Sequence, residues 1–297
     1  MMSPKISIIT PNFNQGKYIE ETIISVINQD YPNLEYIIID GGSTDESVEI
    51  IKKYEKHLTY WISEPDKGQA DAINKGLAHC TGDLFNWINS DDILAVNALK
   101  TISELYKPGL TIAGKVFNFY PENPALNDFT QNSNLTHNEF LNLKSTYHQP
   151  GIWVNLHDTK SFGLDIKSHY YFDFFFYVNY LKKNTEISYT DKVLANFRVH
   201  AESKTSLIQE KSKEEIVSFY KNLYQSEKDK SIKVIIKRVL NYWLALEQIK
   251  LWQAHEPSFK NSINFVKFIS FNFKYMKVNV FWKFVLKYTI NYKGLRG

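Results

Sequence analysis

Short apolar runs and helix-period stretches alternate along the first 120 residues. The runs at Ile6–Ile9 and Tyr36–Ile39 have the length and β-branched or aromatic character of strands. The second run is apolar throughout, which is typical of a strand covered on both faces. Between them, apolar residues recur at positions 19, 23, 26 and 27, the spacing of one helix face. The pattern therefore predicts a strand, a helix and a second strand within residues 5–40.

The same alternation continues to residue 119. It predicts strands at Leu58–Ile62, Leu84–Ile88 and Leu110–Phe119, and helices over Gln69–His79 and Ala95–Tyr106. Strands that alternate with helices favour an α/β fold, in which helices flank a mostly parallel sheet on both faces. Ligands of such sheets bind at the carboxyl ends of the strands.

The pattern weakens after residue 119. Residues 120–150 contain Pro121, Pro124 and many Asn, and we expect a loop with one short helix there. A helical pattern returns at Tyr171–Leu181, and the polar stretch 200–213 predicts a domain boundary.

These features divide the chain into two regions. We expect a first domain over residues 1–205, with halves of about 1–118 and 119–205. Residues 206–297 are expected to form a helical, basic and aromatic C-terminal region, with one or two amphipathic helices over 214–255.

Composition excludes several classes of protein. The chain has 297 residues, 43% of them hydrophobic and 23% charged, and its 20 Phe, 19 Tyr and 6 Trp exclude disorder as the dominant state. The single cysteine, Cys80, excludes a disulfide scaffold, a zinc finger and a CxxC redox motif. The start, MMSPKISIITPNF, does not read as a signal peptide, and no apolar run approaches the roughly 18–20 residues of a membrane span. We therefore expect neither export nor an integral membrane protein.

The net charge of +3 hides a strong asymmetry. From residue 230 to the end, 13 Lys and Arg residues stand against two acids, and 11 aromatic residues lie between Phe259 and Tyr292. Two interpretations stay open: helices that pack their aromatic faces on the first domain, or an interfacial segment that binds an anionic bilayer. Nucleic-acid binding is disfavoured because this stretch has no Arg cluster and no nucleic-acid motif.

Polar clusters follow three of the predicted strands. TPNFN ends the first, DGGSTD the second and NSDD the strand at Leu84–Ile88, so all three lie at the ligand-binding edge of the sheet. The carboxylates of Asp91 and Asp92 are hard oxygen ligands that suit Mg²⁺ or Mn²⁺. Neighbouring side chains in extended backbone point to opposite sides, so we expect one to bind a metal and the other a sugar hydroxyl. A turn or a helix cap is the alternative for this pair.

Two further polar groups have alternative interpretations. Asp40 precedes two glycines and is either a turn residue or an acceptor for a base N–H or a ribose hydroxyl. After Gly68, the residues Asp71, Asn74 and Lys75 share one helix face. That face is either solvated or lies over a nucleotide.

Three segments together resemble the family 2 glycosyltransferases, nucleotide-sugar-dependent enzymes with the GT-A fold, a Rossmann-like α/β fold. The segments are SIITPNFNQGKYIEETIISVINQDYPNLEYIIIDGGSTDES, SEPDKGQADAINKGLAHCTGD and NWINSDD, in that order and at family-like intervals. The resemblance runs from about Ile6 to His200, two thirds of the chain. It is greatest to the branch that builds bacterial surface polysaccharides such as O-antigens and capsules.

The resemblance implies roles for residues in the donor half. The end of the first strand lines the nucleoside pocket, Asp40 hydrogen-bonds the uracil, and Asp92 ligates the divalent metal, Mn²⁺ or Mg²⁺, on the diphosphate. Asn89 stands where many members have another aspartate. Because Ile73 replaces a frequent Arg, neutralisation of the diphosphate is expected to fall to Lys67, Lys75 or the metal. The residues expected to contact the nucleotide sugar are Thr10, Pro11, Asn12, Asp40, Lys67, Asp71, Asn74 and Asp91.

The resemblance also implies an acceptor side. The segment Tyr147–Gly151 resembles the family's Gln-Pro segment, which places His148 and Gln149 near the donor sugar. Asp173 matches the catalytic base at the start of a helix, with a simple helix cap as the alternative. His200 matches a further metal ligand or diphosphate contact in the segment that closes over the site.

An inverting hexosyltransferase is the function that the resemblance implies. Asp173 would accept the proton of the acceptor hydroxyl while the metal stabilises the leaving nucleoside diphosphate. The expected donor is a UDP-sugar and the expected acceptor a glycan or an undecaprenyl-diphosphate-linked sugar. The expected location is the cytoplasm, at the inner face of the plasma membrane if the C-terminal region binds lipid.

Two other functions are weighed against it. One is a catalytically inactive GT-A domain that binds sugar nucleotide or scaffolds a polysaccharide-assembly complex. The other is a nucleotidyltransferase, which is disfavoured because TPNFNQGKY is not a Gly-rich phosphate loop.

Overall fold

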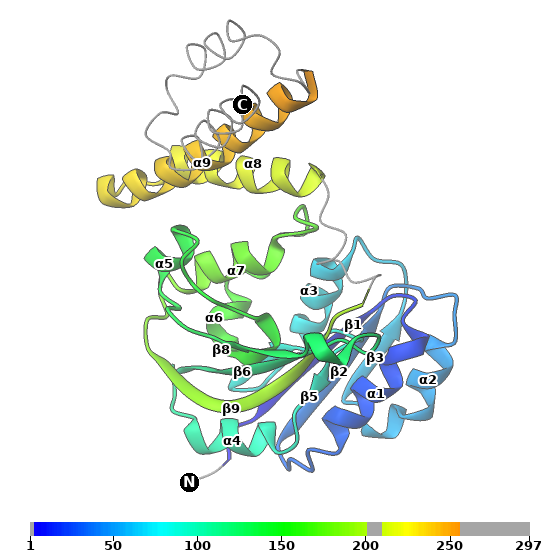
Figure 1. Ribbon diagram of the computed structural model, residues 1–297. Helices are drawn as coiled ribbons and strands as arrows, with labels where there is room; N and C mark the ends of the chain where they lie inside the picture. The colour runs from blue at the N-terminus through cyan, green and yellow to red at the C-terminus, as the bar shows by residue number, and fades with distance from the viewer. Residues whose placement is uncertain (1–2, 201–209, 256–297) are drawn as a thin grey trace, which may run out of the picture. The chain divides into compact units, whose positions relative to one another are not determined.

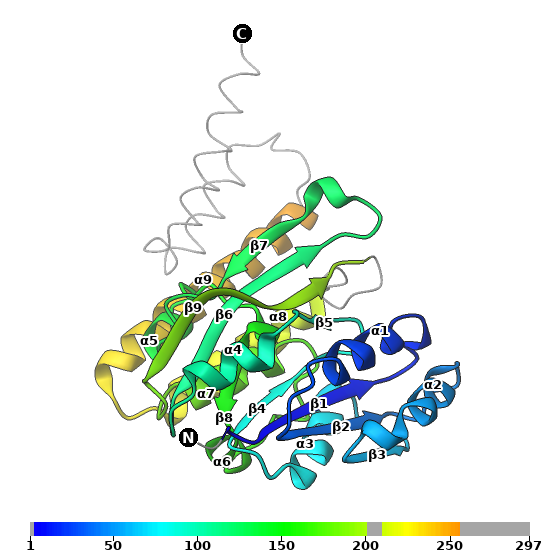
Figure 2. The same cartoon turned by 90° about the horizontal axis from the view of Figure 1, so that it is seen from below.

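A nine-stranded sheet forms the centre of the first part of the chain (Figures 1 and 2). The computed structural model describes residues 3–200 and 210–255. The strands are β1 (Ile6–Asn12), β2 (Leu34–Asp40), β3 (Tyr60–Ser63), β4 (Leu84–Trp87), β5 (Ile93–Leu94), β6 (Thr111–Phe119), β7 (Asp128–Gln131), β8 (Ile152–Asn155) and β9 (Ile187–Arg198). Their order is β3-β2-β1-β4-β8-β6-β9-β5, with β7 paired to β6.

The sheet has a parallel half and a mixed half. Strands β3, β2, β1 and β4 are all parallel, as the alternation of strands and helices predicts. In the other half only β6 and β9 pair in parallel, while β8, β7 and β5 pair antiparallel with their neighbours. In β1 and β2, Asn12 lies opposite Asp40, so the polar residues after both strands meet at one edge.

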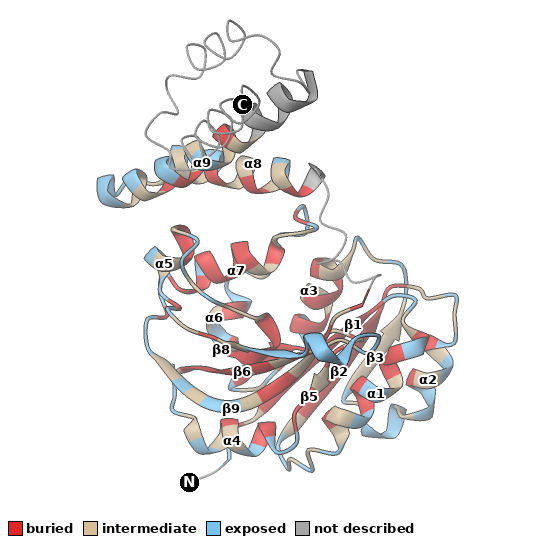
Figure 3. Cartoon of the chain, in the orientation of Figure 1, coloured by how far each residue is buried: buried red, intermediate tan, exposed pale blue. Residues whose placement is uncertain are grey.

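Helices cover both faces of the sheet. Figure 1 shows α1 (Gly16–Ile27), α2 (Ser47–Lys53) and α4 (Ala98–Leu105) on one face, and α3 (Gln69–His79), α6 (Leu156–Lys160) and α7 (Phe172–Tyr180) on the other. The apolar face predicted for the first helix packs inward, because Ile19, Ile23 and Val26 are all fully buried. Figure 3 shows the same pattern throughout, with buried positions concentrated in the strands and on the inner sides of the helices.

Helix α3 has the bounds that the sequence predicts, and one glycine sets how closely it packs. A Cβ on Gly76 would lie 2.8 Å from Ile9 Cδ1, so the helix backbone rests directly on a side chain of β1. This close approach brings the amino end of α3 to the edge where β1 and β4 end.

The region 120–150 has more structure than its sequence predicts. Besides one short helix, α5 (His137–Leu141), it contains strand β7, whose residues are exposed or half-buried and give no apolar run. Its pairing with β6, from Asn118 opposite Asp128 to Lys115 opposite Gln131, depends on the partner strand, which a local pattern does not contain.

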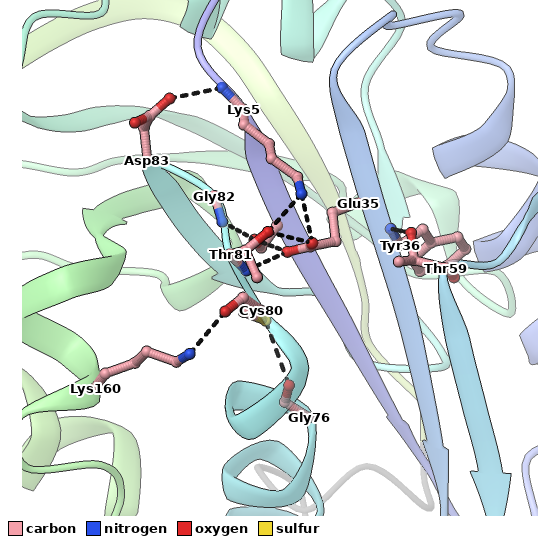
Figure 4. Close-up of polar contacts among 11 residues, drawn as sticks. Lys5, Glu35, Tyr36, Thr59, Gly76, Cys80, Thr81, Gly82, Asp83 and Lys160 are labelled. Atoms are coloured by element: carbon pink, nitrogen blue, oxygen red, sulfur yellow. Dashed lines mark hydrogen bonds and ion pairs between the residues drawn. The ribbon is translucent and has the colours of Figure 1, made fainter.

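A polar cluster closes the opposite end of the parallel strands (Figure 4). Glu35, only 2% exposed, accepts hydrogen bonds from Ser7 Oγ at 2.5 Å and from the Thr81 backbone N–H at 2.6 Å, and pairs with Lys5 Nζ at 2.8 Å. Burial raises the pKa of Glu35, but the hydrogen bonds from Lys5, Ser7 and Thr81 outweigh burial and leave its pKa lowered. This cluster joins β1, β2 and the turn before β4, and so fixes the strands whose other ends form the cleft described below.

The chain divides into two units. One comprises Met1–Phe140 and Lys144–Ser212, and the other Leu141–Leu143 and Lys213–Gly297. In the second unit the structure describes helices α8 (Glu210–Ser226) and α9 (Lys230–His255). The basic aromatic stretch Phe259–Tyr292 lies outside the described residues. None of the helices within the described ranges is both long and apolar enough to span a bilayer.

Candidate nucleotide-sugar site

A cleft of about 530 Å³ opens where β1, β2 and β4 end and α3 begins. Its position agrees with the rule that ligands of parallel sheets bind at the carboxyl ends of the strands. Both ionisable side chains that line it within the described residues, Asp66 and Asp91, are acidic. The lining residues are Pro11, Asn12, Phe13, Gln15, Gly41, Asp66, Gly68, Gln69, Ala72, Asn89, Ser90, Asp91 and Phe197.

The loop after β1 forms one wall of the cleft. Pro11 and Asn12 line it, and so does the next residue, Phe13, which is 59% exposed. Thr10, by contrast, is fully buried, and its hydroxyl lies 3.1 Å from Tyr36 Oη. The Thr10 side chain therefore supports the strand end and does not line the cleft.

Asp40 is enclosed by donors from its own turn, from β1 and from β3. It is fully buried, and Oδ1 accepts hydrogen bonds from Asn12 Nδ2 at 2.6 Å and Ser43 Oγ at 2.5 Å. Oδ2 accepts from Ser63 Oγ at 2.6 Å and from the backbone N–H groups of Gly42 and Ser43. Burial raises the pKa of Asp40, but these donors outweigh it and lower the pKa. In the structure the carboxylate of Asp40, the expected base acceptor, is bonded to protein donors, and it does not line the cleft.

Asp66 lines the cleft from the loop between β3 and α3. Its Oδ1 accepts a hydrogen bond from the backbone N–H of Gly68 at 2.7 Å. Its Oδ2 lies against Gly41, where an added Cβ would be only 2.6 Å away. Gly68 has a φ of +109°, a conformation that favours glycine and directs the loop into the start of α3. Burial raises the pKa of the Asp66 carboxyl.

The turn after β4 separates the two adjacent aspartates. Asp91 lines the cleft, whereas Asp92 is fully buried and does not. The Asp92 carboxylate accepts hydrogen bonds from Asn89 Nδ2 at 3.0 Å and from the Arg198 backbone N–H at 3.1 Å. Thr22 fixes the same turn by donating to the carbonyl oxygens of Ser90 and Asp92. Burial and the neighbouring Asp91 charge raise the pKa of Asp92 well above its ordinary value.

The structure places the two aspartates of the pair in different surroundings. The sequence interpretation assigned the metal to Asp92, but the structure encloses that carboxylate among backbone and amide donors. The aspartate at the cleft surface is Asp91, whose Oδ2 lies 3.1 Å from Nε2 of the buried His200.

Arg198 supports the turn from behind the cleft. It is 6% exposed, and its Nε donates to the Asp91 carbonyl at 2.9 Å while Nη2 pairs with Glu21 at 2.5 Å. The guanidinium lies over two rings, 4.9 Å from the centroid of Tyr18 and 4.7 Å from that of Phe119. The last residues of β9 therefore determine where the Asp91–Asp92 turn lies.

A carboxylate and an imidazole that face each other form a donor set that suits Mn²⁺. Within the described residues, no three His, Cys, Asp or Glu side chains gather as a closed metal site. Mg²⁺ and similar hard cations are often held by one or two carboxylates plus substrate phosphates, so the pair Asp91 and His200 fits a metal that arrives with a diphosphate.

Four other predicted residues have structural contacts instead of cleft contacts. Asn74 exchanges two hydrogen bonds with the backbone of Leu164, and Gln149 donates to Asn86 Oδ1 and to the Trp87 carbonyl. Asp71 accepts from the backbone N–H of Lys67 at 3.0 Å at the start of α3. The cleft lining does not include Lys67 or Asp71.

The acceptor-side residues lie next to the cleft wall. The His148 ring lies against Phe197, a lining residue, with centroids 4.1 Å apart and the ring planes tilted by 49°. Burial lowers the pKa of His148 to about 4. The hydroxyl of the preceding residue, Tyr147, lies 3.5 Å from Asp173 Oδ2. Asp173 lies in the first turn of α7, half-buried beside aromatic rings, and the cleft lining does not include it.

Sequence reasoning missed several lining residues, chiefly Phe13, Asp66 and Phe197. A signal existed for two of them, because Phe13 lies inside the TPNFN cluster and Asp66 lies two residues before the turn glycine Gly68. Phe197 reaches the cleft only because β9 pairs with β6 and β5, which a local pattern does not predict.

A family model, curated proteins and solved structures match this chain. The family model described as glycosyl transferase family 2 matches residues 7–165 of this chain. TuaG of Bacillus subtilis, a glycosyltransferase whose name refers to teichuronic acid biosynthesis, is 40% identical over 94 residues, which are 30% of this chain and 36% of TuaG. Among curated relatives with similar matches, the matched stretch spans 35–41% of their length.

Two solved structures share the fold. Residues 1–349 of TarS from S. aureus, in complex with UDP-GlcNAc, superpose with a TM-score of 0.61 at 17% identity, over 91% of this chain and 81% of that one. The mannosyltransferase PcManGT from Pyrobaculum calidifontis, in complex with GDP-Man and Mn²⁺, superposes with a TM-score of 0.58 at 15% identity, over 98% and 87%. The predicted GT-A fold is confirmed.

Proposed function

The chain belongs to glycosyl transferase family 2, and from this membership we propose that it transfers a hexose-type sugar from a UDP-sugar to a hydroxyl group, with inversion at the anomeric carbon. The observation on which the proposal depends is the cleft at the carboxyl ends of β1, β2 and β4, with Asp91 facing His200 at one end. The matched TarS structure holds UDP-GlcNAc, which supports a uridine donor.

The charges around the cleft support a bound divalent cation. Asp66 and Asp91 both repel a diphosphate, and a cation held by Asp91 and His200 would reverse the local potential. When bound, Mn²⁺ or Mg²⁺ would supply positive charge to the leaving diphosphate. The matched mannosyltransferase structure contains Mn²⁺, which agrees with this choice of metal.

The aromatic wall of the cleft supports nucleoside binding. Phe13, an exposed aromatic residue, lines the wall formed by the β1 loop, where a base ring can stack on it. The backbone of Pro11 and the side chain of Asn12 continue this wall.

Asp173 is the group that we propose as the base. It lies at the start of α7, beside Tyr147, and the segment that precedes it approaches the cleft, since His169 Nδ1 lies 3.6 Å from the position of a Cβ on Gly68. Asp173→Asn should leave nucleotide affinity near that of the wild type while turnover falls by roughly 10²–10⁴. Asp165→Asn, an exposed aspartate on the preceding loop, is the matched control and should retain turnover. Equal turnover in both variants would remove Asp173 as the base.

A panel of nucleotide sugars tests the overall proposal. Thermal shift and product release are measured with UDP-, GDP- and dTDP-sugars in the presence of Mn²⁺. Stabilisation and transfer with UDP-sugars alone are the expected result. Stabilisation without transfer to any glycan or lipid-linked acceptor would instead indicate an inactive sugar-nucleotide-binding domain, and no response to any nucleotide contradicts the proposal.

The relative named for teichuronic acid biosynthesis supports an acceptor in surface polysaccharide synthesis, for which we propose a glycan or an undecaprenyl-diphosphate-linked sugar. Helix α9 supports peripheral binding to a membrane that presents such an acceptor. On one face of this helix, Val234 is 70% exposed and Tyr242 is 37% exposed. Lys237 and Arg238 lie on the same face and are also exposed. Apolar and aromatic side chains flanked by cations suit an anionic lipid surface.

Co-sedimentation with phosphatidylglycerol vesicles tests this membrane proposal. The double variant Lys237→Gln/Arg238→Gln should bind these vesicles more weakly than the wild type, by about 1 kcal/mol for each charge. The matched control is Lys182→Gln/Lys183→Gln, an adjacent basic pair in the first unit. Equal binding by both double variants, or none by the wild type, contradicts the proposal.

A further inference from the structure

The segment 160–169, which links α6 to α7, runs along helix α3 in the direction opposite to the helix. At the carboxyl end of α3, Lys160 Nζ donates a hydrogen bond to the Cys80 carbonyl at 2.7 Å (Figure 4). At the amino end, His169 Nδ1 lies 3.6 Å from the position of a Cβ on Gly68. From Gly68 to Cys80 the helix advances by about 18 Å, at about 1.5 Å per residue. The segment therefore contacts α3 at both of its ends.

Asn74 holds the middle of this segment. Its Nδ2 donates a hydrogen bond to the Leu164 carbonyl at 2.8 Å, and its Oδ1 accepts one from the Leu164 backbone N–H at 2.9 Å. Gly163 allows this approach, because it has a φ of +61° and an added Cβ would lie 2.9 Å from Asn74 Oδ1. Leu164 is buried, so its backbone groups would be costly to leave unpaired. One side-chain amide thus fixes both backbone groups of a residue that is distant along the chain.

The two partners of this contact lead to different parts of the proposed site. The first turns of α3 line the nucleotide-sugar cleft through Gln69 and Ala72. The segment 160–169 leads instead into α7, whose first turn contains Asp173. Helix α3 is therefore shared by the cleft and by the segment that precedes the proposed base.

We propose that Asn74 is a positioning residue for Asp173, because it holds the segment 160–169 on α3 and so fixes where α7 begins relative to the cleft. The inference rests on the proposed function, in which Asp173 is the base. A base acts only within hydrogen-bond reach of the proton that it accepts, and a displacement of about 1 Å can cost roughly 10²-fold in rate. Asn74 produces this effect through the backbone of Leu164, without contact to the substrate.

Asn74→Ala removes both hydrogen bonds and keeps a good helix former in α3. The kcat for release of UDP from a saturating UDP-hexose should fall by roughly 10–100-fold. The affinity for UDP, measured by isothermal titration with Mn²⁺, should stay within about twofold of the wild type, since a factor of two is under about 0.5 kcal/mol. Hydrogen exchange in peptides that contain Leu164 should become faster, because its N–H loses its acceptor.

Asn33→Ala is the matched control. It removes an amide hydrogen bond to a backbone carbonyl, that of Ser3, at the opposite end of the parallel strands. It should leave kcat, UDP affinity and exchange at Leu164 at their wild-type values.

Gly163→Ala disturbs the same contact from the other side, since its Cβ meets Asn74 Oδ1. It should also lower kcat and speed exchange at Leu164 without loss of UDP affinity, and it is the second test if a thermal melt shows that Asn74→Ala fails to fold. Loss of UDP affinity in Asn74→Ala but not in Gly163→Ala would show that Asn74 binds the nucleotide, and that pattern overturns the inference. Unchanged exchange at Leu164 in both variants also overturns it. A wild type that releases UDP from no UDP-sugar refutes the proposed function, whereas unchanged kcat in Asn74→Ala beside an active wild type refutes only this inference.

Discussion

Arg198 should be a positioning residue for the acidic turn, and Arg198→Met tests this. The substitution removes the guanidinium but keeps an unbranched apolar side chain between Tyr18 and Phe119. The side chain of Arg198 is 7% exposed, so its hydrogen bond to the Asp91 carbonyl is shielded from water. After the substitution that carbonyl loses its charged donor.

The size of the effect follows from the separate contacts. A hydrogen bond from a charged donor contributes about 1.5–3 kcal/mol, and each ring contact about 0.5–1 kcal/mol. The Glu21 pair adds little, about 0–1 kcal/mol, because the Glu21 side chain is 58% exposed. These contributions add to about 2.5–6 kcal/mol, and the Met side chain keeps part of the packing between the two rings. We therefore expect Arg198→Met to lower the free energy of unfolding by about 2–4 kcal/mol, which is roughly 5–15 °C in Tm for a unit of this size.

Calorimetric melting and sugar-transfer kinetics, measured well below Tm, distinguish positioning from bulk stability. Arg198→Met should lower kcat at saturating donor, because the Asp91 turn shifts relative to the cleft, and Arg198→Lys should restore only part of the loss, since a lysine cannot form the planar contacts. Glu21→Gln is the control and should change stability by under about 1 kcal/mol. A Tm within about 1 °C of the wild type, with unchanged kcat, refutes this reasoning.

Three further predictions concern other parts of the first unit. Because the folded pKa of Glu35 is lowered, its charge stabilises the fold above the ordinary value of 4.5, and that contribution is lost as the pH falls through the folded pKa. Glu35→Gln should therefore flatten the fall in stability that urea titrations measure below about pH 5. Gly76→Ala should destabilise the fold by about 1–3 kcal/mol because its Cβ meets Ile9 side-chain atoms. The Cβ of Gly109→Ala meets no neighbour, so the only cost of that substitution is the backbone φ of +80°, and equal Tm losses in the two variants contradict this packing argument. His200→Ala should weaken Mn²⁺ binding by roughly tenfold or more in titrations with UDP present, while substitution of the exposed His157 by Ala should leave it unchanged. An unchanged metal affinity in His200→Ala removes His200 as a metal ligand.

The parallel half of the fold was predictable because its information is local. The apolar runs of β1 and β2 and the bounds of α3 follow from residue spacing within windows of a dozen residues, and the structure has them where the pattern predicts. Strands β5, β7 and β9 depend on partners far away along the chain, as in the pairing of Ile93 with Asn196. A local pattern does not contain that information.

In the candidate site, too, local sequence predicts some features and contacts between distant segments determine the others. The sequence indicated which loops meet, since the clusters after β1, β2 and β4 all line or support the cleft. It did not indicate which carboxylate would remain open. Asp40 and Asp66 are both aspartates that closely precede a turn glycine. Yet five donors from three segments enclose Asp40, while one backbone N–H holds Asp66.

The number of protein donors around each carboxylate also distinguishes the adjacent Asp91 and Asp92. Asp92 lies where the backbone of β9 passes, so the Arg198 N–H captures one of its oxygens and Asn89 the other. Asp91 lies one residue earlier and points the other way, toward the cleft and His200. The two side chains diverge at the turn after β4, and the arrival of β9 decides which one is enclosed. The two carboxylates that line the cleft are therefore Asp91 and Asp66, whereas Asp92 and Asp40 are enclosed by protein donors.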